Sequence, residues 1–357
     1  GQKCGLIGTI YYDTGEKSCE AGLTTPDCLD VAEKQYQMVQ AGAKYMVIEA
    51  SSHALAQNRL AAIDFKAAAF TNLAGDHLDY HKTKADYLAA KAKLFQDLPS
   101  GSVSVLNKQS AEAHKIAEQT KADILWYAVD EPADITAQIK AMDAEETAFL
   151  LGYAGQSRMV KISLPGRYNV ANCLAAAGLT IAIGFDLKTV ADGLSALKTI
   201  PGRLEKLPSH GFSAFIDYAH TDDALKNTLA TLKPVCEGEL IVVFGCGGDR
   251  DKTKRPRMAK VAEQLADFVI VTSDNPRTED ALGIINDITA GFSNPDSQKI
   301  IVEADRKKAI KLAIERAAKN DFVLIAGKGH EAYQIIGRQR FDFSDKKIAQ
   351  DFINRRK

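Results

Sequence analysis

The chain has 357 residues, 46% of them hydrophobic and 25% charged, a composition that fits two or three globular domains, with two favoured. Its 45 basic and 46 acidic residues leave a formal net charge of -1, which argues against a protein that binds nucleic acid or membrane surfaces through bulk charge. No apolar run approaches the roughly 20 residues needed to span a bilayer, and the N-terminus carries no signal-peptide pattern.

The first half alternates short β-branched runs with longer helical patterns. We expect strands at 45–49, 67–72 and 102–106, and helices at 27–41, 86–96 and 110–120. Such alternation predicts βαβ units and a mostly parallel sheet. Short alternating runs in 121–165 indicate an antiparallel edge, and two helices are expected at 169–183 and up to about 197.

Pro201 and Gly202 punctuate a linker at 199–203, which predicts a domain boundary there, with one domain at 1–199 and the other at 200–357. The second half restarts the α/β rhythm with strands expected at 212–216, 240–244, 268–272 and 322–326. These runs are almost continuously apolar, as in parallel strands covered by helices on both faces. The predicted fold class is therefore α/β throughout.

Three loops follow predicted strands of the second half, at 245–250, 273–277 and 327–331. Parallel strands would gather all three at one edge, where doubly wound sheets bind ligands. Together they offer two guanidiniums, one ammonium, several carboxylates and many glycine amides, a set that suits a zwitterion such as an amino acid. Glycine-rich turns are common in α/β proteins, so a single loop would carry no such prediction.

The first half offers a second cluster. Glu49 ends one predicted strand, and His77 follows another within a segment rich in carboxylates. A carboxylate and a histidine at neighbouring strand ends can hold Mg²⁺. Taken alone, Glu49 is better explained as an ion-paired strand end and His77 as a loop hydrogen-bonder, and Lys91 alone would be a solvated helix lysine.

Four segments are long and uncommon enough to indicate a family: 76–81 (DHLDYH), 245–251 (GCGGDRD), 274–277 (DNPR) and 327–331 (GKGHE). They resemble the motifs of the Mur ligases, most closely the MurE type, over about residues 6–344. The resemblance implies a P-loop-like central domain followed by a Rossmann-like C-terminal domain. It also implies an ATP-dependent, Mg²⁺-dependent ligase of peptidoglycan precursor synthesis.

The resemblance assigns roles to matching residues of the central part. It implies contacts to a UDP-muramyl-dipeptide, UDP-MurNAc-L-Ala-D-Glu, from Thr24, Thr25, Ser51, Gln57 and Arg59. Glu49 and His77 resemble Mg²⁺ ligands, and Lys91 matches a lysine that is carbamylated in the family and so gains a carboxylate. Asn169, Arg203 and Asp217 resemble ATP contacts, although Asn169 also suits a helix N-cap.

In the C-terminal part, the site for the incoming amino acid is implied at Arg250, Asp274, Asn275, Pro276, Arg277, Gly327 and Glu331. Family members that add meso-diaminopimelate carry Arg at the last place of D-N-P-R. Arg277 can pair with a carboxylate that diaminopimelate has and lysine lacks, and left unpaired it would penalise lysine. We therefore expect meso-diaminopimelate as the substrate, with a lysine-adding ligase as the alternative.

The sequence departs from the family at one point, because no G-x-x-x-x-G-K-[ST] motif occurs in the 357 residues. Residues 1–5 resemble the end of the helix that follows the P-loop. We expect a truncated ligase that is inactive alone, since the family's cradle for the β- and γ-phosphates is missing. The parent would form an acyl phosphate from ATP and then the amide, with closure about 199–203 bringing the reactants together.

Three other readings remain open. A folylpolyglutamate synthetase-like ligase shares the ATP chemistry but is not expected to carry D-N-P-R. A nicotinamide-dependent oxidoreductase is disfavoured because G-x-G-x-x-G is absent. A non-catalytic binding module is the third. The six cysteines form no C-x-x-C pair, so we predict reduced thiols in a cytoplasmic protein. We expect a monomer, although the sequence itself carries little information on oligomeric state.

Overall fold

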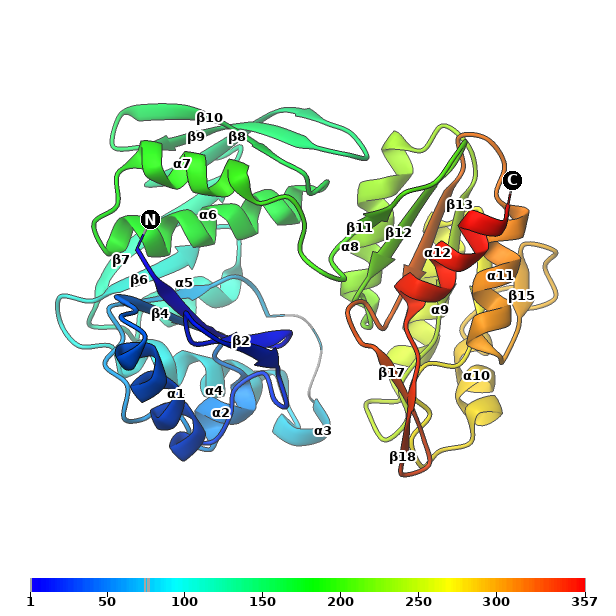
Figure 1. Ribbon diagram of the computed structural model, residues 1–357, viewed down its shortest axis with the longest axis horizontal. Helices are drawn as coiled ribbons and strands as arrows, with labels where there is room; N and C mark the ends of the chain where they lie inside the picture. The colour runs from blue at the N-terminus through cyan, green and yellow to red at the C-terminus, as the bar shows by residue number, and fades with distance from the viewer. Residues whose placement is uncertain (1, 74, 76–77, 357) are drawn as a thin grey trace. The chain divides into compact units, whose positions relative to one another are not determined.

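The computed structural model describes residues 2–73, 75 and 78–356 (Figure 1). These residues form two compact units. One comprises Gly1–Leu73, Tyr80–Tyr127 and Ala175–Phe185, and the other comprises Ala74–Asp79, Ala128–Leu174 and Asp186–Lys357. The described residues include no helix long and apolar enough to cross a membrane.

The first unit contains a four-stranded sheet in the order β3-β2-β1-β4, in which β1 and β4 are parallel and β1, β2 and β3 antiparallel. Strands β5, β6 and β7 pair in parallel. The bounds are β1 Cys4–Ile7, β2 Tyr11–Asp13, β3 Ser18–Glu20, β4 Tyr45–Ile48, β5 Ala67–Phe70, β6 Val103–Asn107 and β7 Asp123–Val129. The expectation of a helix end at 1–5 is wrong for Cys4 and Gly5, which pair with β4 as a strand.

The helices expected in the first half are present. They are α1 Cys28–Gln40, α4 Lys84–Gln96 and α5 Ala111–Ala117, joined by the shorter α2 Ser52–Ala56 and α3 Leu78–His81. Asp27 is the N-cap of α1. Its side chain accepts hydrogen bonds from the amides of Leu29 and Asp30, which fixes where the helix begins. Val31 and Met38 of α1 pack with Ile7 and Leu55 in one core of the unit.

The segment expected to be antiparallel forms a meander of β8 Ile135–Met142, β9 Thr147–Tyr153 and β10 Gln156–Ile162. Two helices follow, α6 Arg167–Ala182 and α7 Leu187–Ala196. The N-cap expectation for Asn169 is wrong, because the residue lies inside α6 and its Nδ2 donates to the carbonyl of Pro165 at 2.8 Å.

The C-terminal sheet has the order β11-β12-β16-β13-β14-β15, with every neighbouring pair parallel except β11 and β12. All four strands expected here are present, and β13 and β16 have the expected bounds. The strands are β11 Glu205–Leu207, β12 Ser213–Asp217, β13 Leu240–Phe244, β14 Phe268–Val271, β15 Ile300–Val302 and β16 Phe322–Ala326, followed by the hairpin β17 Tyr333–Ile336 and β18 Gln339–Asp342.

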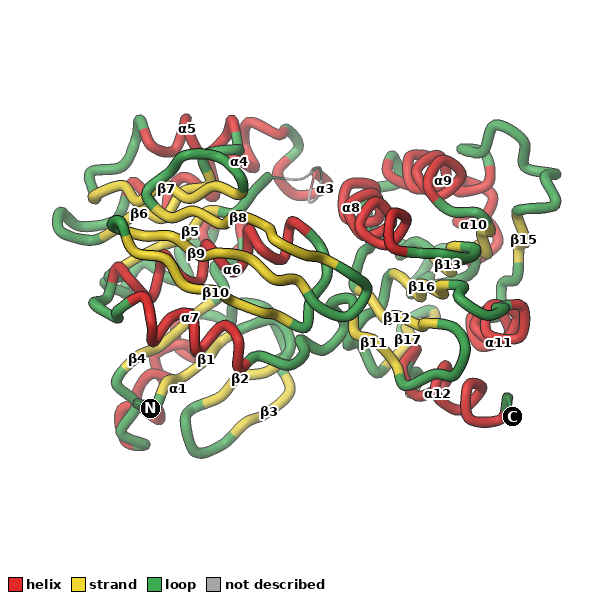
Figure 2. Tube along the Cα trace, turned by 90° about the horizontal axis from the view of Figure 1, so that it is seen from above, coloured by secondary structure: helices red, strands yellow, loops and turns green. Residues whose placement is uncertain are grey.

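Helices cover both faces of this sheet (Figure 2). Val242 and Phe244 face α8, α9 and α10, whereas Ile241 and Val243 face α11 and α12. The continuous apolar strands thus supply two cores at once. The helices are α8 Asp222–Leu232, the short 3₁₀ turn Lys233–Val235, α9 Lys254–Leu265, α10 Ala281–Thr289, α11 Arg306–Arg316 and α12 Asp345–Arg355.

Candidate functional site

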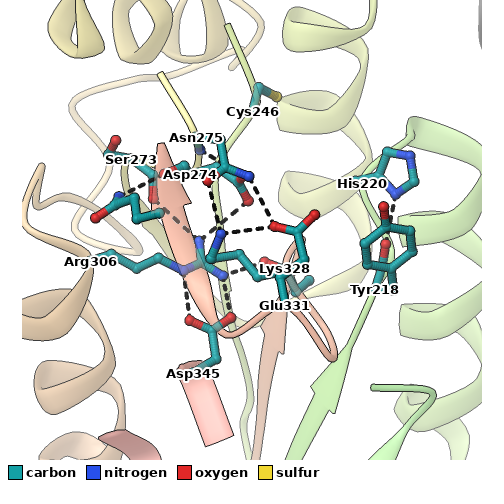
Figure 3. A network of polar contacts seen from close by, with 12 residues as sticks. Tyr218, His220, Cys246, Ser273, Asp274, Asn275, Arg306, Lys328, Glu331 and Asp345 are labelled. Atoms are coloured by element: carbon teal, nitrogen blue, oxygen red, sulfur yellow. Dashed lines mark hydrogen bonds and ion pairs between the residues drawn. The ribbon is translucent and has the colours of Figure 1, made fainter. Parts of the chain in front are cut away.

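The loops after β13, β14 and β16 meet at the carboxyl edge of the C-terminal sheet, as predicted (Figure 3). The amide of Gly248 donates to the carbonyl of Asn275 at 2.9 Å, which joins the first loop to the second. Asn275 Nδ2 donates to Glu331 Oε2 at 2.9 Å, which joins the second loop to the third. The three motifs therefore form one hydrogen-bonded cluster.

Glycine allows this close approach at two positions. A Cβ on Gly248 would lie 1.9 Å from the carbonyl oxygen of Pro276, so no other residue fits without moving a backbone. Gly327 has φ of +116°, and a Cβ there would lie 2.6 Å from Asp274 Oδ2. The glycines thus let the first and third loops pack directly onto the D-N-P-R segment.

Lys328 lies at the centre of the cluster with its side chain fully buried. Its Nζ donates to Asn275 Oδ1 and to Glu331 Oε2, both at 3.0 Å. Asn275 Oδ1 also accepts from the amide of Ile335 at 3.0 Å. Two donors on Oδ1 fix which end of the Asn275 side chain is the oxygen, and Nδ2 must then face Glu331.

Arg306 contacts the ends of the two strands that precede the second and third loops (Figure 3). Its guanidinium lies fully buried at the start of α11, where it donates to the carbonyls of Ser273 and Ala326 at 3.3 and 2.9 Å. Asp274 Oδ2 lies 3.9 Å from Nη1. Asp345 on α12 accepts two further hydrogen bonds, at 2.8 and 2.7 Å. The strand ends before both motifs are thereby fixed to two helices.

Arg277 and Arg250 occupy different environments. Arg277 is half-buried with φ of +52°, and its Nη1 donates to the carbonyl of Gly248 at 2.8 Å. Its other guanidinium donors have no protein acceptor among the described residues. Arg250 is exposed, and within the described part of the chain its side chain bonds only the carbonyl of its neighbour Asp249, at 2.9 Å. Arg277 is thus integrated in the cluster, whereas the position of the Arg250 side chain is set by its own loop.

Gly202, Arg203 and Asp217 lie beside the third loop. A Cβ on Gly202 would lie 2.3 Å from the amide nitrogen of His330, and the carbonyl of Gly202 accepts from the amide of Tyr218 at 2.8 Å. The Arg203 guanidinium lies 5.1 Å from the centre of the Tyr218 ring. These contacts fix residues 202–203 to the third loop and to the end of β12.

The Asp217 carboxylate is buried and engaged by its own fold. It accepts from the amides of Leu204 and Ala219 at 2.7 and 2.8 Å. Burial raises its pKa, and these hydrogen bonds oppose the rise. In this arrangement the carboxylate orders the entry to β12.

In the first unit, Glu49 follows β4 and holds the turn after β1. Its Oε2 accepts from the amide and the hydroxyl of Thr9, at 3.1 and 2.7 Å. Thr9 Oγ1 lies 3.0 Å from Thr24 Oγ1. The other oxygen of Glu49 has no hydrogen-bond partner among the described residues, so it is available for a ligand.

Thr25, Ser51, Gln57 and Arg59 form a connected group. Thr25 Oγ1 donates to the carbonyl of Glu49 at 2.6 Å and accepts from the amide of Ser51 at 3.0 Å. Arg59 donates to the carbonyl of Thr25 at 2.8 Å and, through Nε, to Gln57 Oε1 at 2.9 Å. Four of the residues expected to bind the nucleotide-linked substrate thus lie together around α2, with Ser51 at its N-cap and Gln57 at its C-cap.

Lys91 lies on α4, partly buried, with its Nζ 5.3 Å from the centre of the Tyr87 ring. Burial lowers the pKa of Lys91, and the negative charge of Glu49 opposes this shift. His77 lies outside the described residues. Among residues 2–73, 75 and 78–356, no group of three or more His, Cys, Asp or Glu side chains is placed to hold a metal ion.

Family models match almost the whole chain. The Mur ligase middle domain matches residues 1–180, and the Mur ligase glutamate ligase domain matches residues 202–329. The chain belongs to the Mur ligase family. Lys328 was expected only as the ammonium of the third loop, without a buried supporting role, and the Arg306–Asp345 pair was not expected at the site.

Curated Mur ligase relatives cover the full length of this chain. The UDP-N-acetylmuramoyl-L-alanyl-D-glutamate--2,6-diaminopimelate ligase of Geobacillus kaustophilus is 42% identical over 363 residues, covering 100% of this chain and 74% of the relative. The ligase of the same name from Bacillus licheniformis is 43% identical and covers 99% of this chain and 73% of the relative.

Solved structures show the same fold. A structure of a UDP-N-acetylmuramoyl-L-alanyl-D-glutamate--2,6-diaminopimelate ligase is 36% identical, with a TM-score of 0.65, covering 99% of this chain and 73% of that one. Mycobacterium tuberculosis folylpolyglutamate synthase, solved with ADP and AMPPCP, has a TM-score of 0.69 over 91% of this chain and 82% of its own. At 19% identity the second likeness concerns the fold alone.

Proposed function

We propose that this chain carries the chemistry of an ATP-dependent ligase that adds meso-diaminopimelate to UDP-MurNAc-L-Ala-D-Glu in peptidoglycan precursor synthesis. One observation carries the proposal. The D-N-P-R and G-K-G-H-E loops are joined through Asn275 and Glu331, while Arg277 from the same cluster keeps free guanidinium donors. One carboxylate and one guanidinium fixed to a common frame suit the ammonium and carboxylate groups of an amino acid.

The proposed reaction has two steps. The γ-carboxylate of D-Glu attacks the γ-phosphorus of ATP, which forms an acyl phosphate and releases ADP. The deprotonated amine of diaminopimelate then attacks the acyl carbon, the new C–N bond forms, and phosphate leaves. Holding both reactants lowers the entropic part of the second barrier. In this scheme residues 1–199 hold the nucleotide-linked substrate and residues 200–357 hold the amino acid.

The roles proposed for the central part of the chain come from the family resemblance, and the contacts of the described residues support them. Thr24, Thr25, Ser51, Gln57 and Arg59 would contact the UDP-muramyl-dipeptide, and Arg59 is the cation available there for an anionic group. Glu49 and a carbamylated Lys91 would hold Mg²⁺ together with His77. The free oxygen of Glu49 suits a hard cation, and bound Mg²⁺ would neutralise charge on the phosphoryl groups.

The depressed pKa of Lys91 supports its carbamylation, because only the neutral amine adds CO₂. A carbon-13 NMR spectrum recorded in labelled bicarbonate should show a carbamate signal for the wild type. The signal should be missing in Lys91→Arg.

We propose ATP contacts at Asn169, Arg203 and Asp217, whose side chains differ in exposure. Arg203 is exposed, so its guanidinium is open to an anionic ligand, whereas both oxygens of Asp217 already accept hydrogen bonds from the protein. We expect Asp217 to act by ordering the segment that carries Arg203.

We also propose that the protein is a cytoplasmic monomer with no nucleic-acid or membrane partner. A reducing compartment such as the cytoplasm suits the six free cysteines.

Isothermal titration calorimetry on the 357-residue chain tests the amino-acid specificity. Meso-diaminopimelate should bind, with lysine and glutamate each at least ~10-fold weaker, because one lost charge-assisted contact removes about 1.5–3 kcal/mol. Equal binding of lysine would favour the lysine-adding alternative. Preferential binding of glutamate would favour a folylpolyglutamate synthetase-like ligase.

A further inference from the structure

We propose that Lys328 is a positioning residue for the amino-acid substrate, which acts by fixing the orientation of the Glu331 carboxylate. This inference rests on the proposed function, because it assumes that Glu331 receives the substrate ammonium. Lys328 itself would make no contact with substrate, since its side chain has no exposed surface.

The backbone and the hydrogen-bond partners around Lys328 hold its side chain in one position. Lys328 lies between Gly327 and Gly329. Both glycines have positive φ, a backbone conformation that β-branched and bulky residues rarely adopt. Its ammonium has two acceptors, Asn275 Oδ1 and Glu331 Oε2, and lies 5.4 Å from the centre of the Tyr333 ring. A buried cation with this set of partners is compensated and geometrically fixed.

The consequence falls on Glu331. Its Oε2 accepts from both Lys328 Nζ and Asn275 Nδ2, at 3.0 and 2.9 Å. Its Oε1 has no hydrogen-bond partner within the part of the chain that the structure describes. The Glu331 side chain is 14% exposed. One of its oxygens is thus held by the protein, and the other is left for a ligand.

Asn275 completes the arrangement, because it couples the orientation of Glu331 to the hairpin that follows. Its Oδ1 accepts from Lys328 and from the amide of Ile335 in β17, and its Nδ2 donates to Glu331. Removal of the Lys328 ammonium would leave Oδ1 with one donor and Glu331 with one. The carboxylate could then rotate, and its buried charge would lose its compensating partner.

A double-mutant cycle in this chain tests the inference. Lys328→Met, Glu331→Gln and the double variant are compared by calorimetry for their affinities for meso-diaminopimelate and for UDP-MurNAc-L-Ala-D-Glu. We expect Lys328→Met to weaken diaminopimelate binding at least 10-fold, with the affinity for the nucleotide-linked substrate unchanged. In the Glu331→Gln background the same change should have less than a 2-fold effect.

Lys311→Met is the matched control, because Lys311 is exposed on α11 and its one ion pair among the described residues is with Glu315, four residues on. It should bind diaminopimelate as the wild type does. If Lys328→Met does not fold, Lys328→Gln carries the same cycle, since its amide keeps a donor. Thermal unfolding of every variant separates a loss of stability from a loss of affinity in the folded protein.

The outcomes separate the two levels of the proposal. A wild-type chain that fails to bind meso-diaminopimelate would overturn the proposed function. A wild-type chain that binds, with Lys328→Met binding equally well, would overturn the role of Lys328 alone. Additive effects in the cycle would do the same, because they would show that Lys328 does not act through Glu331.

Discussion

Arg306 and Asp345 form a two-point ion pair that has no exposed surface on either side chain. Nε and Nη2 of the guanidinium donate to the two carboxylate oxygens at 2.8 and 2.7 Å and so join the starts of α11 and α12. The same guanidinium holds the carbonyls of Ser273 and Ala326. The pair therefore links the packing of two helices to the loops of the candidate site.

Asp345→Ala should strongly destabilise the protein, because it leaves a buried guanidinium without its carboxylate. We expect the free energy of unfolding to fall by about 3–5 kcal/mol, measured by urea denaturation. The matched control is Asp192→Ala, whose partner Lys188 is exposed, and it should cost about 0–1 kcal/mol. Equal losses for the two variants would contradict a supporting role for the buried pair.

Gly248→Ala should displace the D-N-P-R loop, because the new Cβ would fall 1.9 Å from the carbonyl oxygen of Pro276. We expect meso-diaminopimelate affinity to drop at least ~10-fold, equivalent to about 1.4 kcal/mol. Gly193 lies exposed in α7 with no atom within 4 Å of its Cβ position. Gly193→Ala should therefore leave binding intact and stabilise the chain by about 0.5–1 kcal/mol.

Arg277→Ala should remove the discrimination between meso-diaminopimelate and lysine. The free guanidinium donors of Arg277 would pair with the carboxylate that lysine lacks, so diaminopimelate should lose about 1.5–3 kcal/mol of binding while lysine loses little. Arg338→Ala, a change to an exposed arginine in the β17–β18 turn, is the control. An unchanged preference in Arg277→Ala would show that specificity lies elsewhere.

Glu279 should give the protein a measurable acid sensitivity. Hydrogen bonds from Arg255 above all, and from Lys252 and the amide of Asp249, lower its pKa to about 2, against an ordinary value of 4.5. The stabilisation is present above pH 4.5 and is lost as the pH falls toward 2, because the unfolded chain then binds the extra proton. Between these values the wild type should lose stability more steeply than Glu279→Gln, as followed by urea denaturation at each pH.

Sequence patterns identified the elements that are buried on both faces. The continuous apolar runs of β13 and β16 were placed to the residue, because such runs have few alternatives in an α/β chain. Strands such as β3 and β18 were not predicted from the sequence. Every one of their residues is exposed, so neither strand has a buried face that would give an apolar pattern. Pattern information is strong only where burial is continuous or periodic.

The candidate site was predicted through its motifs, but its internal support was not. Lys328 and Asn275 are 53 residues apart, and Arg306 and Asp345 are 39 apart. A polar or charged residue in a loop or a first helical turn is ordinarily exposed, and the packing of distant segments buries these four. The roles of Glu49 and Lys91 as metal ligands likewise remain predictions.

The attachment of Gly202 to the amide of His330 and to Tyr218 has a mechanical consequence. Any movement of the C-terminal sheet must carry Gly202 with it, because this residue packs on the third loop and accepts a hydrogen bond at the end of β12. If Arg203 binds the nucleotide and Glu331 the amino acid, as proposed, the backbone distance between the two binding residues would stay fixed during such a movement.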